Sequence, residues 1–187
     1  VFLLPSGAAL AASAAVYSHR DWRLWVTDER PGGRVLLRID PATGLIAPPT
    51  ELPVLDGLTQ IKLTTVEDGR VLVAGNGGSF TLALLDSDPY TGEVTVVSVL
   101  EGEGELVATP VVRDGLISLA VELPAPGGSE LVLESVTVAD LEGIADGGKL
   151  TLCHLPPGNA DNPQSLRVGW PALAAHLGHG DRLGACP

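Results

Sequence analysis

Apolar residues recur along the chain in short runs that are separated by turns rich in glycine, proline and aspartate. Valine, leucine, isoleucine and threonine dominate these runs, which is the composition of strands rather than helices. In residues 130–139 polar and apolar positions alternate in part, so one face of that strand is expected to meet water. We predict strands at residues 23–27, 35–40, 61–65, 70–74, 80–86, 93–100, 106–113, 116–122, 130–139 and 150–154.

Helical signals are confined to one short segment near the C-terminus. Residues 171–177 begin with Pro171, which suits the first helical position, and Gly178 follows as a stop signal. The chain is therefore predicted to be mainly β.

A degenerate repeat runs through the middle of the chain. IDPATG at residues 39–44 echoes SDPYTG at residues 87–92, an offset of 48 (88 − 40). DGRVLV at residues 68–73 echoes DGLISL at residues 114–119, an offset of 46 (114 − 68), and DWRLWV at residues 21–26 fits the same strand. The unit resembles a β-propeller blade of about four short strands, and about three units fit.

Two architectures follow from this pattern. The first is an antiparallel β-sandwich or jelly-roll-like pair of sheets, and the alternative is a set of partial, propeller-like repeats. We divide the chain into an N-terminal apolar arm (residues 1–20), a β-domain (residues 21–148) and a small C-terminal module (residues 149–187).

The formal net charge of −12 excludes some partners. Nucleic-acid binding needs a basic face that displaces counterions, and anionic membrane surfaces also attract basic rather than acidic proteins. We therefore expect neither nucleic acid nor an anionic membrane as a partner.

The first 18 residues carry no charge, and their small residues resemble a signal-peptidase site. The chain has no methionine and begins at valine, so we expect a processed or partial chain without a membrane span in its mature form. The arm has large apolar side chains whose exposure would be unfavourable. We predict that it adds as a donor strand to a neighbouring copy, through Phe2, Leu3, Leu4, Leu10 and Val16. The alternative is that it folds back as an edge strand of its own domain.

Two stretches near the C-terminus share cysteines and histidines. Residues 152–159 read LCHLPPGN, and residues 175–186 read AHLGHGDRLGAC. Together they resemble a C-terminal module of bacterial secreted and cell-surface proteins. Its pattern is Cys-His-x-Pro-Pro-Gly-Asn, a spacer with a short strand, and Ala-His-Leu-x-His-Gly-Asp-x-x-Gly-x-Cys. The resemblance implies a bacterial protein outside the cell or at its surface, and it assigns no biochemical role.

The only two cysteines, Cys153 and Cys186, lie near the edges of this module. An even count in an apparently exported protein favours a disulfide. The alternative is a pair of buried free thiols in a cytosolic protein.

Three of the four histidines lie within the loop that this disulfide would close. His154, His176 and His179, with Asp181, are a sufficient ligand set for zinc or copper. In the alternative interpretation each histidine donates a hydrogen bond to a backbone carbonyl and orders the loops.

No nucleophile elbow or recognisable Ser/His/Asp order is present, so we do not expect an enzyme, and a secreted hydrolase is the residual alternative. Trp22 and Trp25 could form a sugar-stacking surface, although packing in the core is favoured. The leading hypothesis is a structural subunit of an extracellular filament or surface assembly that polymerises head-to-tail through its N-terminal arm. The second hypothesis is a monomeric secreted binding or adhesion module with a histidine-based metal site.

Overall fold

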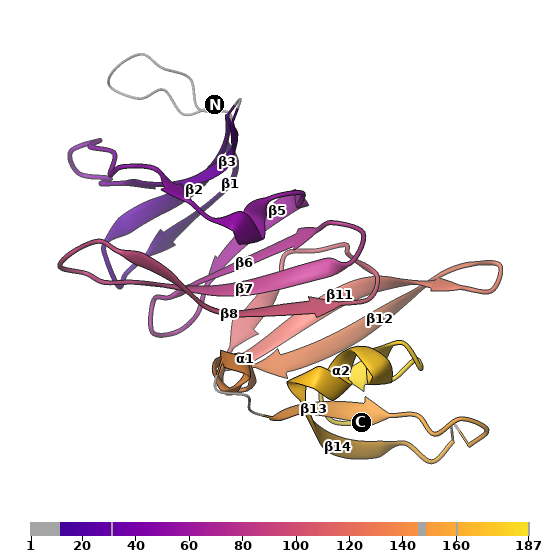
Figure 1. Ribbon diagram of the computed structural model, residues 1–187. Coiled ribbons are helices and arrows are strands. Elements are labelled where there is room, and N and C mark those ends of the chain that lie inside the picture. Colours follow the sequence, from indigo (N-terminus) through magenta and orange to yellow (C-terminus); the bar gives the residue numbers. More distant parts are fainter. Residues whose placement is uncertain (1–11, 31, 146–148, 160, 187) are drawn as a thin grey trace.

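Antiparallel β-sheets make up most of the protein (Figure 1). The computed structural model describes residues 12–30, 32–145, 149–159 and 161–186. Within these ranges the strands form three successive sheets and a smaller C-terminal one, which confirms the prediction of a mainly β chain.

The first three sheets are each built from consecutive strands of the chain. The first sheet contains β1 (Ala12–Ser18), β2 (Arg23–Arg30), β3 (Gly33–Ile39) and β4 (Thr50–Glu51). The second sheet contains β5 (Thr59–Thr65), β6 (Val71–Asn76), β7 (Phe80–Ser87) and β8 (Val94–Gly102). The third sheet contains β9 (Glu105–Leu106), β10 (Val111–Arg113), β11 (Leu116–Ala125) and β12 (Gly128–Thr137), with both β9 and β10 paired to β11. A short 3-10 turn, Pro53–Leu55, connects the first two sheets.

Both faces of the second sheet are buried. Alternate residues of a strand point to opposite faces, so Leu72 packs toward the third sheet while Val71 and Val73 pack toward the first. The near-continuous apolar sequence of β6 follows from this double burial. Trp25, on the first sheet, joins the cluster that contains Val71.

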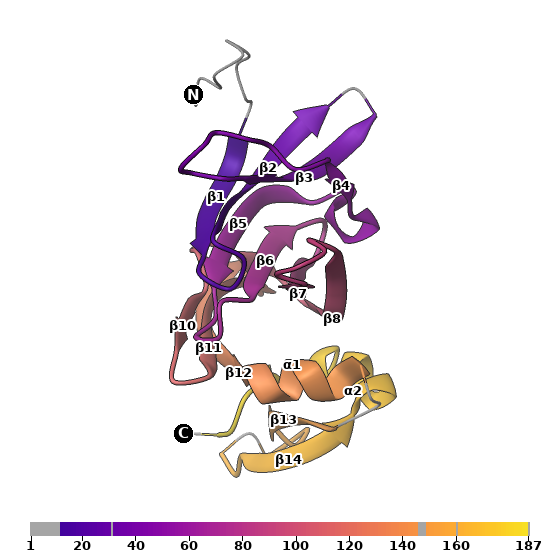
Figure 2. The same ribbon diagram turned by 90° about the vertical axis from the view of Figure 1, so that its left-hand side faces the viewer.

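The packing combines features of both predicted architectures. The second and third sheets share one apolar core, as the two layers of a sandwich do. As expected for propeller-like units, each sheet is built from consecutive strands, and β1 of the first sheet contacts β5 of the second (Figure 2). The architecture is therefore a stack in which the second sheet packs against the first on one face and against the third on the other.

Three local predictions differ from the structure. Residues 12–18, assigned to the arm, form the edge strand β1 of the chain's own first sheet, as the alternative for the arm predicted, rather than part of a donor strand. The single strand expected at residues 106–113 is split into β9 and β10, with Pro110 between them, which has no N–H to donate to a ladder. The strand expected to reach residue 139 ends at Thr137, where α1 (Val138–Ala145) begins and the Thr137 hydroxyl accepts the Asp140 N–H at 3.0 Å.

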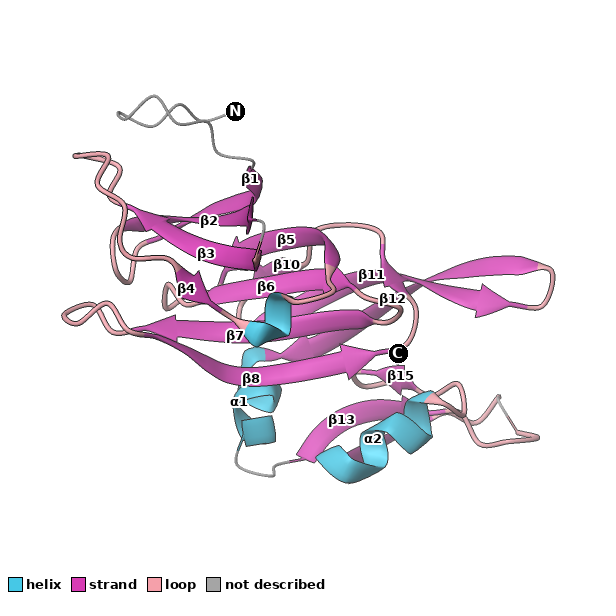
Figure 3. Cartoon of the chain, turned by 45° about the horizontal axis from the view of Figure 1, so that its top comes forward, coloured by secondary structure: helices cyan, strands magenta, loops and turns pink. Residues whose placement is uncertain are grey.

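The C-terminal module has a small sheet of its own and one helix. Its elements are β13 (Lys149–His154), β14 (Gln164–Gly169), α2 (Trp170–Leu177) and β15 (Arg182–Leu183), of which Figure 1 labels β14 and Figure 3 labels the other three. Apolar side chains of the module, among them Leu152, Leu173 and Leu183, join the core shared by the second and third sheets. The module is thus packed against the β-domain. Among the described residues, no helix combines the length and the apolar character that crossing a bilayer requires.

Candidate metal centre

Asp181 occupies the centre of the C-terminal module. Helix α2 ends near Leu177, and the Gly180 N–H donates to the Leu177 carbonyl at 2.9 Å. Gly180 has a φ of +87°, which favours glycine and lets the chain reverse tightly. The reversal places Asp181 next to the last turn of α2, immediately before β15.

The two oxygens of Asp181 have three partners. Oδ1 accepts the Leu155 N–H at 2.8 Å. Oδ2 lies 2.8 Å from His154 Nδ1 and 2.7 Å from His176 Nδ1. The imidazoles come from the end of β13 and the last turn of α2, and their rings meet edge to face with centroids 5.6 Å apart. Segments that are more than twenty residues apart in the chain therefore converge on one carboxylate.

The surroundings of Asp181 favour its ionised form. Its side chain is fully buried, whereas the two imidazoles are about a quarter exposed. Burial by itself would raise the pKa of Asp181, but the hydrogen bonds from His154, the Leu155 N–H and His176 together lower it below its usual value. The site therefore holds a buried negative charge that faces two imidazole rings.

The predicted disulfide is confirmed and supports this site directly. Cys153 and Cys186 are bonded, with Cα atoms 4.7 Å apart. Cys153 immediately precedes His154 on β13, and the Cys186 N–H donates to Ser165 Oγ at 2.9 Å. The cross-link ties the end of the chain to the strand that presents His154.

The three donor atoms are suited to a transition metal. His154, His176 and Asp181 offer ligand atoms that lie within 4.8 Å of one another. Tetrahedral zinc with bonds of about 2.0–2.1 Å separates its nitrogen and oxygen ligands by roughly 3.3 Å. A small widening of the present contacts would admit an ion, provided that each imidazole carries its proton on Nε2. Solvent could complete the coordination, because both rings are partly exposed.

The other predicted site residues lie elsewhere. His179 is exposed in the turn after α2 and lies outside this three-residue group. Val16 belongs to β1 and packs against the cluster that contains Trp25, so it is part of the chain's own first sheet. The remaining predicted assembly residues, Phe2, Leu3, Leu4 and Leu10, lie outside the described residues. Trp25 is fully buried, as core packing predicts, whereas Trp22 is 69% exposed.

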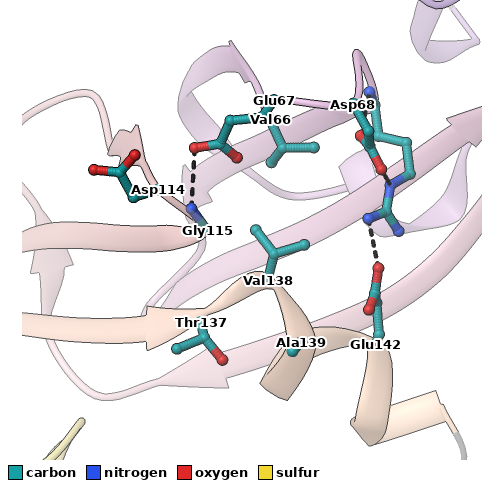
Figure 4. Close-up of a pocket in the computed structure, with 10 residues that line it drawn as sticks. Val66, Glu67, Asp68, Asp114, Gly115, Thr137, Val138, Ala139 and Glu142 are labelled. Atoms are coloured by element: carbon teal, nitrogen blue, oxygen red, sulfur yellow. Dashed lines mark hydrogen bonds and ion pairs between the residues drawn. The ribbon is translucent and has the colours of Figure 1, made fainter.

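A pocket of about 460 Å³ lies where the second sheet, the third sheet and α1 meet (Figure 4). Arg70 forms ion pairs with Asp68 at 2.6 Å and with Glu142 at 2.5 Å, and Glu67 accepts the Gly115 N–H at 3.0 Å. These contacts join the sheets to the helix and satisfy most of the charges that line the pocket. Sequence reasoning missed this junction, although the Thr137-x-x-Asp140 capping signal pointed to the helix.

Comparisons with known proteins add no assignment. No family model matches the chain, and no curated protein matches it.

Proposed function

We propose that this protein is a bacterial extracellular or cell-surface β-scaffold whose C-terminal module binds a zinc or copper ion. The observation that carries the proposal is the convergence of His154 Nδ1 and His176 Nδ1 on one oxygen of buried Asp181. Imidazole nitrogen and carboxylate oxygen suit both metals.

The disulfide and the resemblance of the module to those of secreted proteins support an oxidising location. We propose binding rather than catalysis. Among the described residues, no serine, cysteine or lysine side chain hydrogen-bonds to either imidazole, so the cluster lacks an activated nucleophile.

The metal proposal is tested by titrating the purified, oxidised protein with zinc and with copper(II) in a calorimeter. We expect one ion per chain. His176→Ala should weaken binding at least a hundredfold, because it removes one of three ligands. His179→Ala is the matched control, since it removes an exposed imidazole three residues away and should leave the affinity unchanged.

Two results would contradict the metal proposal. One is the absence of saturable binding of either ion by the wild-type protein. The other is an equal loss of affinity in the two histidine variants, which would indicate nonspecific binding by surface imidazoles.

A second candidate function is self-assembly, and it also remains a proposal. One observation favours it: Leu131 and Leu133 of the third sheet are 64% and 81% exposed, and Val111 on the same face is 63% exposed. Exposed apolar patches mark interaction surfaces in many proteins. We propose a second copy of this chain as the partner of this face.

A further inference from the structure

The turns that join β1 to β2, β5 to β6 and β10 to β11 occupy equivalent positions in the sequence repeat. The turns of the second and third sheets contain Gly69 and Gly115, whose φ angles are +87° and +73°. The equivalent residue of the first sheet, 47 positions before Gly69 (69 − 22 = 47), is Trp22, with a φ of +57°. Positive φ favours glycine and is unfavourable for a bulky side chain. Trp22 therefore stands where the two later repeats have glycine.

Packing within the chain does not account for this tryptophan. Its side chain is 69% exposed, and the neighbouring Trp25 provides the buried aromatic ring of this hairpin. An exposed aromatic ring at an unfavourable backbone position indicates a role outside the fold.

A second exposed aromatic residue, Tyr90, also occupies a turn that does not need an aromatic side chain. Tyr90 is 96% exposed in the turn between β7 and β8, where its N–H donates to Asp88 Oδ1 at 2.7 Å. The equivalent turn of the first sheet contains Ala42, whose N–H donates to Asp40 Oδ1 at 2.9 Å. The same turn thus forms without an aromatic side chain.

Side-chain contacts connect the two turns. The Arg38 guanidinium donates to the Gly92 carbonyl, and its Nη1 lies 3.6 Å from Asp21 Oδ2. Arg20 Nε lies 2.7 Å from Asp86 Oδ1, close to the start of the second turn. The contacts of Arg38 and Arg20 therefore hold the segment that carries Trp22 next to the segment that carries Tyr90.

A pocket of about 290 Å³ lies at this junction, and Arg20, Ser87, Asp88 and Glu93 are among the residues that line it. Ser87 is 2% exposed, and its hydroxyl has no hydrogen-bond partner in the part of the chain that the structure describes. A buried hydroxyl without a partner is unfavourable, so a ligand that hydrogen-bonds to Ser87 would be stabilised.

The charges around the pocket indicate the kind of ligand. One guanidinium, Arg20, and three carboxylates, Asp86, Asp88 and Glu93, line the pocket, and Arg20 pairs with Asp86 at 2.7 Å. The two remaining carboxylates disfavour an anionic ligand. Neutral hydroxyl groups can donate to the carboxylates and accept from the arginine. Aromatic rings, for their part, offer an apolar face to the C–H face of a sugar ring. We propose that this pocket binds a neutral glycan together with the exposed rings of Trp22 and Tyr90, which lie within two residues of the lining residues Arg20 and Pro89 in the chain.

The test uses the full chain and a panel of neutral hexaoses: cellohexaose, chitohexaose, mannohexaose and maltohexaose. Polygalacturonate and oligo-lysine serve as anionic and cationic probes. We expect saturable binding of at least one neutral hexaose in calorimetry, with a change in tryptophan fluorescence. Trp22→Gly should weaken this binding at least tenfold, and Tyr90→Ala should weaken it as well.

The glycine variant is chosen because it restores the residue type of the equivalent turns, so it should melt no lower than the wild-type protein. Leu133→Ala is the control, because it removes an apolar side chain that is 81% exposed on the third sheet and should leave binding unchanged. The proposal is overturned if no neutral hexaose binds, if only a charged probe binds, or if Trp22→Gly binds as well as the wild-type protein.

Discussion

At the scale of single residues, Glu134 is the most unfavourably placed carboxyl group with a resolved pKa shift. It lies on β12 facing the C-terminal module and is 6% exposed. Burial raises its pKa to about 7, against the lowering effects of the Leu183 N–H and the Arg182 charge. Glu134 therefore holds its proton in the folded protein at a pH where an exposed glutamate would lose it.

The raised pKa of Glu134 makes the free energy of unfolding fall as the pH rises. Below about pH 4.5 the carboxyl group is neutral in both the folded and the unfolded chain, so it contributes no penalty. Between that pH and about pH 7 only the unfolded chain loses the proton, and the free energy of unfolding falls as the pH rises. Above about pH 7 the full penalty, at most about 3 kcal/mol, is present.

Glu134→Gln should remove this penalty, because the amide is neutral at every pH. We expect the variant to raise the free energy of unfolding by roughly 1–3 kcal/mol at pH 8 and to have little effect at pH 4. Urea unfolding at the two pH values measures the difference. Glu101→Gln, at an exposed position of β8, is the control. An equal effect of Glu134→Gln at both pH values would contradict the burial argument.

At the scale of elements, the C-terminal module depends on its disulfide. The module is small, and part of its apolar surface is covered by the core of the second and third sheets. Cys153 and Cys186 are 33 positions apart, and a cross-link over such a loop stabilises by about 3–4 kcal/mol on the chain-entropy model.

Reduction of the disulfide should therefore loosen the module before the sheets. We expect amide-exchange protection in β13 to fall by roughly a hundredfold, because about 3 kcal/mol of local stability is lost. Protection in β6, which is buried on both faces, should stay unchanged. Cys186→Ser without reductant should reproduce the effect and should not respond further to reductant. A comparable loss of protection in β6 would show that module and sheets open as one unit.

At the scale of the whole molecule, the outer face of the third sheet differs from the faces that are covered by another sheet. Trp25 and Leu72 occupy equivalent positions on the faces that the next sheet covers, and Ser118 occupies this position on the third sheet. The centre of the third sheet's outer face is therefore small and polar, while Leu131 and Leu133 lie exposed on the neighbouring strand. Such a face suits contact with another molecule better than continuation of the apolar stack.

Self-association through this face should be weak and salt-dependent. The net charge of −12 opposes contact between copies, and added salt screens that repulsion. We expect sedimentation velocity to show more association at high salt than at low salt. The double change Leu131→Ser with Leu133→Ser should abolish it, whereas Leu45→Ser, at a 69% exposed position near β3, should not.

A truncation distinguishes association through this face from association through the N-terminal arm. Deleting residues 1–11 leaves β1 intact, because that strand begins at Ala12. Association that survives the truncation and is lost in the double leucine variant supports the face of the third sheet. The opposite pattern supports the arm, and a chain that is monomeric under all conditions contradicts both.

Several features were predictable from the sequence because their causes are local. Alternation of apolar residues and the Asp-Pro-x-Thr-Gly turns predicted the strands, since side-chain direction and turn conformation depend on a few neighbouring residues. The disulfide followed from a cysteine count. An edge strand in the arm was only the alternative interpretation, because an alanine-rich, uncharged run does not itself specify which strand it pairs with.

What the tertiary structure alone decided is which distant residues meet. The sequence determined that three histidines and Asp181 share one module, but the reversal at Gly180 selects His154 and His176 and leaves His179 exposed. The repeat likewise determined equivalent turns, but the folded chain shows that Trp22 is exposed while Trp25 is buried. Both outcomes depend on how sheets and turns pack against one another, and contacts between segments far apart in the chain leave no pattern in a single sequence.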